Sequence, residues 1–265
     1  MNMSFANQVV WITGASSGIG EALAMEFSRY GARVVLSARR TDELERVRQR
    51  LVWPENHLVL ALDMADPSAF SEAVDKVRAH FGRLDILVNN AGISQRSRVM
   101  ETDISVDRRV MEINFFGVIG LTKAVLPWFR EQGAGRVVVI SSLVGELPTP
   151  MRSAYCASKH ALHGWFESLR AEEYDNGLRL LMVLPGFVRT QVSVNAVTAD
   201  GSSHGKMDDY QQQGMPAEVC AERIIHAVQR NRAQVIIAGR EGLGIWLKRW
   251  FPGIYRAIIR RIKVT

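Results

Sequence analysis

The sequence predicts a doubly wound α/β fold, in which one parallel sheet of about seven strands carries helices on both faces. Short apolar, β-branched runs alternate with longer segments of helical periodicity along the chain. Most of these runs are continuously apolar, as expected of parallel strands that helices cover on both sides. No repeat, low-complexity tract or linker divides the 265 residues, so we expect one domain.

The elements are expected in regular alternation, which builds a parallel sheet through right-handed crossovers. The predicted strands are 8–13, 33–38, 57–62, 84–89, 136–141, 178–184 and 234–238. The predicted helices lie near 18–30, 41–50, 67–81, 105–131, 152–175 and 216–230. The polar segment 187–215 interrupts this order, and a connection of that length is expected to be functional or mobile.

The composition is that of a globular protein in a reducing compartment, with 47% hydrophobic and 23% charged residues. Cys156 and Cys220 have no paired spacing, which argues against a disulfide framework or a zinc site. His160 and His163 lack a third ligand, so no metal site is expected. The N-terminus has no signal-peptide pattern, and no apolar run approaches the roughly 18 residues of a membrane span. We therefore expect a cytoplasmic protein without a transmembrane helix.

The net charge of +6 comes from the C-terminal end, because residues 242–265 contain no acid. Its basic residues are Lys248, Arg249, Arg256, Arg260, Arg261 and Lys263. Its helically spaced apolar residues are Leu243, Leu247, Trp250, Ile254, Ile258 and Ile262. Pro252 and Gly253 are expected to split this tail into two short helices.

The tail has the composition of an interfacial segment on anionic lipid, so we expect peripheral membrane contact or entry of a lipid-like substrate beside it. The alternative is a C-terminal helix that packs on its own domain or across a dimer. Binding to nucleic acid is not expected, because the chain has one short basic stripe and no recognised reader motif.

A glycine-rich turn follows the first predicted strand. Gly14, Gly18 and Gly20 precede a predicted helix, whose partial positive end favours a phosphate. The first strand-to-helix turn is where this architecture binds dinucleotides. A plain tight turn is the alternative.

The second strand ends in Arg39 and Arg40 rather than in the carboxylate that would hydrogen-bond a ribose 2′-hydroxyl. Guanidinium groups suit a 2′-phosphate, which favours NADP(H) over NAD(H). Two solvated surface arginines at a helix start are the alternative.

Several motifs then occur in an order that closely resembles the short-chain dehydrogenase/reductase family, over residues 8–240. They are TGASSGIG (13–20), NNAG (89–92), Asn114, Ser142, YCASK (155–159) and PGFVRT (185–190). The segments ISSLVG and SVNAVTADGS are most similar to the branch of hydroxysteroid dehydrogenase-like and lipid-ketone-reductase-like enzymes. The resemblance implies a Rossmann-like fold.

The resemblance implies catalytic roles for Ser142, Tyr155, Lys159 and Asn114. Lys159 would lie one helical turn from Tyr155, and its ammonium and the positive nicotinamide of the oxidised cofactor would together lower the pKa of that phenol from its usual value of roughly 10. Tyr155 would then protonate a substrate carbonyl that Ser142 holds by a hydrogen bond. Asn114 would bind a water that links Lys159 to solvent. Taken singly, the Tyr/Lys pair could be an amphipathic surface pair, Ser142 a turn cap, and Asn114 a buried residue satisfied by backbone.

The resemblance also assigns the cofactor contacts. They are Gly14, Ser16, Ser17, Gly18, Ile19, Gly20, Arg39, Arg40, Asp63, Met64, Asn90, Ala91, Gly92, Tyr155, Lys159, Pro185, Gly186, Val188 and Thr190. Ser17 stands where many NADP-using relatives have Arg or Lys, which leaves Arg39 as the main candidate for the 2′-phosphate.

The expected protein is an NADP(H)-dependent oxidoreductase that interconverts a carbonyl and a secondary alcohol on an apolar, steroid- or lipid-like substrate. Residues 1–241 would form its dinucleotide-binding and catalytic domain, and 242–265 its basic amphipathic tail on the inner membrane surface. The resemblance implies homo-dimers or homo-tetramers that are joined through the helices containing Asn114 and Tyr155. A catalytically weak nicotinamide-binding sensor or scaffold at a membrane surface is the alternative.

Overall fold

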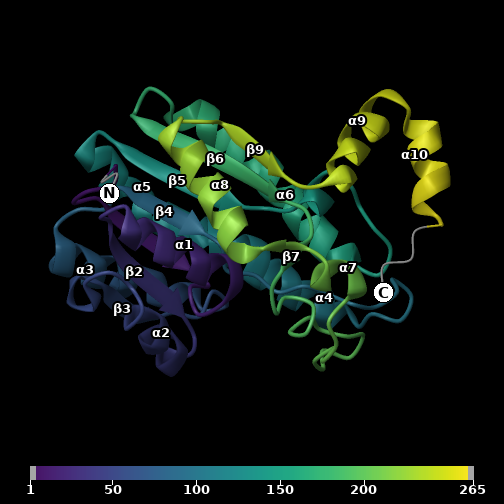
Figure 1. Cartoon of the computed structure of the whole chain (residues 1–265), viewed down its shortest axis with the longest axis horizontal. Helices are drawn as coiled ribbons and strands as arrows, with labels where there is room; N and C mark the ends of the chain where they lie inside the picture. Colours follow the sequence, from purple (N-terminus) through teal and green to yellow (C-terminus); the bar gives the residue numbers. More distant parts are fainter. Residues whose placement is uncertain (1–3, 262–265) are drawn as a thin grey trace.

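The computed structural model describes residues 4–261, which are built around a seven-stranded sheet (Figure 1). Its strand order is β3-β2-β1-β4-β5-β6-β9, and every neighbouring pair is parallel. The strands are β1 (Val9–Thr13), β2 (Arg33–Ala38), β3 (Leu58–Ala61), β4 (Ile86–Asn89), β5 (Gly135–Ile140), β6 (Leu178–Pro185) and β9 (Gln234–Ile237). The predicted fold class is confirmed.

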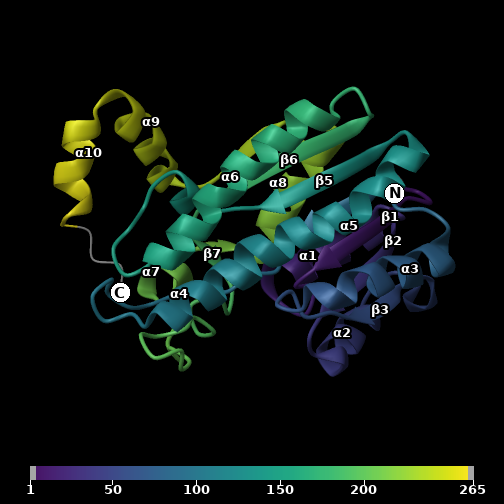
Figure 2. The same cartoon turned by 180° about the vertical axis from the view of Figure 1, so that it is seen from behind.

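Helices cover both faces of this sheet (Figure 2). One layer holds α1 (Gly18–Arg29), α2 (Thr41–Arg48) and α8 (Ala217–Gln229). The other holds α3 (Phe70–Phe81), α5 (Gly117–Gln132) and α6 (Ser153–Glu173). In β1, Val10 and Ile12 pack into the first layer while Val9 and Trp11 pack into the second, because successive side chains of a strand point to opposite faces.

The predicted helix 105–131 has an irregular turn in its middle. It consists of α4 (Ile104–Met111), a π-helical turn (Glu112–Phe116) and α5, and the π turn contains Asn114. By length and composition alone, Ile104–Gln132 is one helix that could cross a membrane. Its buried residues Leu121 and Val125 pack into the core beside the sheet, which is the ordinary reason for such a composition.

The predicted loop 187–215 contains short elements that hold it against the sheet. They are β7 (Val188–Arg189), α7 (Asp209–Gln212) and β8 (Met215–Pro216), and β7 pairs with β8. Val197 also forms a bridge with Gln95, which follows β4 in the chain. The segment therefore lies across the carboxyl ends of the strands. Short 3₁₀ turns occur at Pro54–Asn56, Pro67–Ala69, Leu143–Gly145 and Arg240–Gly242.

The tail forms two helices that project from the body of the molecule (Figure 1). They are α9 (Leu243–Trp250) and α10 (Pro252–Ile259), so the predicted split at Pro252 is confirmed. We call residues 243–259 the C-terminal arm. The Lys248 ammonium donates to the carbonyl oxygen of Glu146, and the Tyr255 hydroxyl donates to that of Pro148 at 3.1 Å. Two residues of the predicted tail pattern, Ile262 and Lys263, lie outside the described part of the chain.

Candidate active site

A cavity of about 1440 Å³ opens at the carboxyl ends of the strands. It runs from the turn after β1 to the C-terminal arm. The chain order of the strands reverses between β1 and β4, and ligands of open α/β sheets bind in the crevice at such a point. The cavity is therefore the candidate site.

The turn after β1 requires glycine at two positions. Gly14 and Gly18 have φ values of +64° and +59°, a left-handed conformation that other residues adopt at a cost. A Cβ atom on Gly14 would lie 2.9 Å from Cα of Ala91, and one on Gly18 would lie 3.0 Å from Cγ2 of Thr190. The turn is thus a narrow backbone cradle at the start of α1, which fits a pyrophosphate.

Gly20 does not line the cavity, which corrects its predicted place among the cofactor contacts. A Cβ there would lie 2.2 Å from the carbonyl oxygen of Gly14, so Gly20 allows α1 to pack against the turn. The Asn90 amide donates to the carbonyl oxygens of Thr13 and Gly14 at 3.0 and 3.1 Å. These contacts fix the turn from behind, while Asn90 itself also lines the cavity.

All the other predicted cofactor contacts line the same cavity. They are Gly14, Ser16, Ser17, Gly18, Ile19, Arg39, Arg40, Asp63, Met64, Asn90, Ala91, Gly92, Tyr155, Lys159, Pro185, Gly186, Val188 and Thr190. Arg39 and Arg40 are exposed at the end of β2, where a charged group on a nucleotide ribose could reach them.

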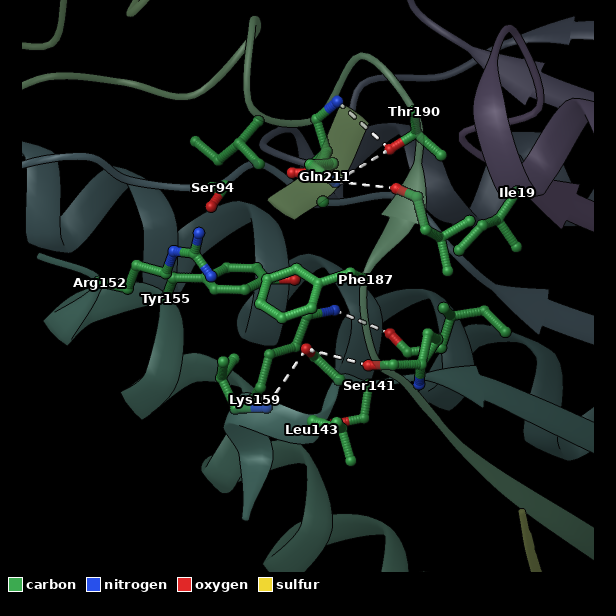
Figure 3. A pocket seen from close by; sticks show the side chains of 18 of the residues that line it. Ile19, Ser94, Ser141, Leu143, Arg152, Tyr155, Lys159, Phe187, Thr190 and Gln211 are labelled. Carbon is green, nitrogen blue, oxygen red and sulfur yellow. Dashed lines mark hydrogen bonds between the residues drawn. The ribbon is translucent and has the colours of Figure 1, made fainter. Parts of the chain in front are cut away.

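Tyr155 and Lys159 lie one turn apart on α6 and both line the cavity (Figure 3). The Lys159 ammonium is buried and donates to the carbonyl oxygen of Ile140 at 2.8 Å. Burial lowers the pKa of Lys159 to about 8.

The predicted lowering of the Tyr155 pKa is wrong for the residues of the chain by themselves. Burial raises the pKa of this phenol above its ordinary value, and the charge of Arg152 and the nearby hydroxyl of Ser142 oppose the rise only in part. Lys159 therefore loses its positive charge above about pH 8, well below the pH at which an exposed lysine loses it.

Ser142 is the second residue after β5 and caps the start of the turn Leu143–Gly145. Its hydroxyl accepts from the backbone N–H of Val144 at 3.3 Å and donates to the carbonyl oxygen of Pro185 at 3.5 Å. The serine lines the cavity beside Tyr155, so the two hydroxyls can reach one substrate oxygen.

Asn114 is fully buried and does not line the cavity. Its amide accepts from the N–H of Ile93 at 2.8 Å, donates to the carbonyl of Ile93 at 2.9 Å, and donates to Ser158 at 3.1 Å. These are the contacts of the alternative given above, a buried polar residue whose side chain is hydrogen-bonded mainly to the backbone. It lies close behind Gly92, where a Cβ would be 3.1 Å from Asn114 Oδ1 and 3.8 Å from the Lys159 ammonium.

No local sequence pattern indicates the buried charge cluster that lies beside Tyr155. Nε of Arg96 donates to Asp208 at 2.9 Å, and Nη2 of Arg152 donates to the same carboxylate oxygen at 3.0 Å. Both arginines line the cavity. Asp208 is 112 residues from Arg96 and 56 from Arg152, so only the folded chain brings the three together.

His163 also makes contacts that the sequence did not reveal. One ring nitrogen lies 2.8 Å from the Ser141 hydroxyl and the other 3.1 Å from the Glu146 carboxylate. A Cβ on Gly145 would lie 2.7 Å from the first nitrogen, so glycine leaves room for this chain of contacts. His163 thereby holds the segment that follows Ser142. No group of three or more His, Cys, Asp or Glu residues suited to a metal ion occurs within residues 4–261.

The far wall of the cavity comes from segment 187–215 and the C-terminal arm. The rings of Phe187 and Tyr210 stack with centroids 5.4 Å apart. The Gln211 amide donates to the carbonyl of Val188 at 3.1 Å and to the Thr190 hydroxyl at 3.4 Å (Figure 3). The arm contributes Leu243, Gly244, Trp246, Leu247, Trp250, Phe251, Tyr255, Ile258 and Ile259. This end of the cavity is therefore largely apolar.

The chain is similar to known proteins over most of its length. A family model for short chain dehydrogenases matches residues 8–201. A dehydrogenase/reductase SDR family protein 7-like from Drosophila melanogaster is 43% identical over 263 residues, which cover 95% of this chain and 80% of that protein. Dehydrogenase/reductase SDR family member 7B from Bos taurus is 40% identical over 257 residues, covering 94% and 79%. The crystal structure of a short-chain dehydrogenase from Streptomyces avermitilis superposes with a TM-score of 0.82 at 31% identity, covering 97% of this chain and 98% of that one.

Proposed function

The chain belongs to the short-chain dehydrogenase/reductase family, and we propose that it interconverts a ketone and a secondary alcohol with NADP(H). One observation carries this proposal: Ser142, Tyr155 and Lys159 line the same cavity as the glycine turn after β1. A hydroxyl pair that can hold a carbonyl oxygen thus faces a cradle that fits a dinucleotide pyrophosphate.

The residues suit the reductive direction. Because burial raises the pKa of Tyr155, its phenol keeps the proton at neutral pH and can donate it to a substrate oxygen. Ser142 would donate a hydrogen bond to the same oxygen and fix its position. The turn residues Gly14–Ile19, together with Asn90 and Thr190, would hold the dinucleotide, which supplies or accepts the hydride when bound.

The preference for NADP(H) is supported by Arg39 and Arg40 at the end of β2. Both line the cavity and are exposed, so they can turn toward a 2′-phosphate. The exposed carboxylate of Asp63 lies on the same wall, where it can accept a hydrogen bond from the adenine amine.

The proposed substrate is steroid-like or lipid-like, and the part of it that lies beneath the C-terminal arm is apolar. Trp250 and Leu247 line the cavity there, although more than half of the Trp250 surface is exposed. A hydrophobic part of a substrate would cover this surface and remove it from water.

The proposed location is the cytoplasm, with the arm on the inner membrane surface. The exposed aromatic residues Trp246, Trp250 and Phe251 of the C-terminal arm lie among basic residues, and no acid follows Glu241. Co-sedimentation with phosphatidylglycerol vesicles tests this, using Arg249→Glu with Arg256→Glu against the exposed control Arg78→Glu. Equal vesicle binding by all three proteins would remove the membrane proposal.

Self-association through the helices around Asn114 and Tyr155 is also proposed. Ile104 and Phe116 are exposed on α4 and the π turn, on that same helical layer. Light scattering after gel filtration should give a dimer or tetramer, and Phe116→Glu should shift it toward the monomer. A monomeric parent protein would contradict this.

The enzymatic proposal is tested by NADPH consumption with a panel of apolar ketones. Tyr155→Phe should lower kcat by about 10²- to 10⁴-fold, because it removes the acid but little volume. Tyr174→Phe is the matched control, since Tyr174 is exposed outside the cavity. NADPH binding without turnover of any ketone, with Tyr155→Phe behaving like the parent, would instead favour the sensor or scaffold.

A further inference from the structure

The cluster of Arg96, Arg152 and Asp208 is buried but not balanced in charge. The side chains of Arg96 and Asp208 are each 2% exposed, and that of Arg152 is 8% exposed. Two guanidinium groups, which stay charged in proteins, therefore share one carboxylate. His204 lies 3.9 Å from the other Asp208 oxygen and brings no negative charge. One positive charge at the cavity wall is left without a counter-ion within the cluster.

The two arginines differ in how fully they are bonded. Arg96 uses Nε and Nη2 on Asp208, and its Nη1 donates to the Ser94 hydroxyl at 2.8 Å and the Gln95 carbonyl at 2.7 Å. Arg152 donates to Asp208 through Nη2, and its buried Nε has no partner.

Within residues 4–261, the buried arginine Nε atoms without a partner belong to Arg33, Arg152 and Arg170. Arg152 alone among these three lines the cavity. The unmet donor and the excess charge thus coincide on one side chain.

An uncompensated buried charge is costly, and a buried donor without an acceptor adds to that cost. Arg152 also precedes the first residue of α6, a helix of 21 residues with no side-chain cap and no acid in its first turn. The positive end of that helix adds to the potential of the guanidinium. An anion bound from the cavity side would balance the charge of Arg152, offer an acceptor to its guanidinium and place a negative charge at the start of α6.

We propose that Arg152 binds an anionic oxygen group on the substrate, a carboxylate or a phosphate. The substrate is then an amphipathic ketone, with its anionic group at Arg152, its carbonyl between Ser142 and Tyr155, and its apolar part along the C-terminal arm. This inference rests on the proposed carbonyl chemistry and names the class of substrate for it.

A competing role for Arg152 is to tune Tyr155 alone, because its charge also opposes the rise in the pKa of that phenol. Tuning would change the turnover of every ketone by a similar factor. An anion contact instead changes the ratio between an anionic ketone and a neutral one. That ratio is therefore the decisive measurement.

The test uses a series of keto acids with an apolar chain and varied spacing between ketone and carboxylate, each paired with its methyl ester. For the spacing that fits, the parent protein should favour the acid in kcat/KM by about tenfold to a hundredfold, as expected of a charge-assisted hydrogen bond. Arg152→Gln should abolish that preference, while Arg152→Lys should keep part of it. Arg98→Gln is the control, since Arg98 is exposed on the same loop as Arg96 but outside the cavity.

A second experiment measures binding and does not depend on turnover. Decanoate, decyl phosphate and decanol, below their micelle concentrations, are titrated against the full-length protein while its tryptophan fluorescence is followed. Of the six tryptophans, Trp246 and Trp250 line the cavity. The anions should bind more tightly than decanol to the parent, and Arg152→Gln should lose the difference. The two anions together show whether carboxylate or phosphate is preferred.

Arg152→Gln should melt at the same temperature as the parent or higher, because Gln retains a donor for Asp208 and removes the excess charge. Equal use of acid and ester at every spacing, or an acid preference that persists in Arg152→Gln, would overturn the inference while leaving ketone reduction intact. Absence of all turnover would refute the proposed function, and the titration would then decide the anion site by itself.

Discussion

The Lys159 ammonium lies 5.8 Å from the centre of the Tyr155 ring and donates to the carbonyl oxygen of Ile140 at 2.8 Å. Burial moves the pKa values of the two groups apart, lowering that of Lys159 to about 8 and raising that of Tyr155 above its ordinary value. The charge on Lys159 is therefore lost at a lower pH than the phenolic proton.

This order of titration predicts the pH dependence of reduction. Below pH 8 Lys159 is charged, and above it the charge disappears while Tyr155 remains protonated. Since kcat/KM reports the groups of the free enzyme, it should fall about tenfold per pH unit above about 8. Lys159→Arg keeps a charge at this pH and should lack the decline, at a lower overall rate. A decline near pH 10, or the same decline in Lys159→Arg, would assign it to another group.

Gly18→Ala should raise the KM for the dinucleotide and also destabilise the fold. Its φ of +59° costs about 1–2 kcal/mol for a residue with a Cβ, and that Cβ would crowd Thr190 at 3.0 Å. Gly82→Ala is the matched control, since Gly82 has a φ of +70° and no heavy atom within 4 Å of the new Cβ. Thermal melting should show a loss of stability for both variants, larger for Gly18→Ala because of the Thr190 contact, while only Gly18→Ala weakens binding of the dinucleotide. Equal KM values for the two variants would contradict a phosphate cradle here.

Arg39→Ala should raise the KM for NADPH by about tenfold to a hundredfold and leave the KM for NADH nearly unchanged. A guanidinium contact to a 2′-phosphate is a charge-assisted hydrogen bond of that size, and NADH lacks the phosphate. Arg40→Ala shows which of the two arginines makes the contact, and Arg78→Ala on α3 controls for lost surface charge. If NADPH and NADH were affected alike in both Arg39→Ala and Arg40→Ala, NAD(H) would be the better assignment.

Sequence patterns predicted the sheet well, because strand positions depend on local apolar runs. All seven strands occur within about two residues of the expected bounds, and the helices around them follow. The π turn at Glu112–Phe116 was missed, since its pitch reflects close packing: a Cβ on Gly117 would lie 2.1 Å from the Met64 carbonyl oxygen. Such an approach depends on a residue 53 positions earlier, which no local pattern reports.

The residues of the candidate site that belong to contiguous motifs could be predicted from the sequence. The properties that depend on burial in the folded chain could not. The motif YCASK, within the ordered set that resembles the family, led to Tyr155 and Lys159. The direction of the Tyr155 pKa is opposite to the expected one, because the sequence does not show the desolvation of the phenol in the folded chain. Arg152 was missed because its partner, Asp208, lies 56 residues away on segment 187–215, and no local pattern pairs the two residues.

The attachment of the C-terminal arm predicts a further effect. Lys248→Met combined with Tyr255→Phe removes both hydrogen bonds that tie the arm to residues 146–148. Hydrogen exchange should then rise in 243–259 but not in the sheet, and KM should increase for long apolar ketones more than for short ones. Arg256→Gln on α10 keeps both bonds and is the control. Unchanged exchange in the double variant would show that other contacts hold the arm.

Both anchors of the arm end on main-chain carbonyl oxygens, those of Glu146 and Pro148. Every amino acid supplies that acceptor, so replacing the side chains at 146 and 148 leaves the acceptors in place. The attachment therefore tolerates changes of side chain in residues 146–148, whereas in the arm it depends on Lys248 and Tyr255, which supply the donors.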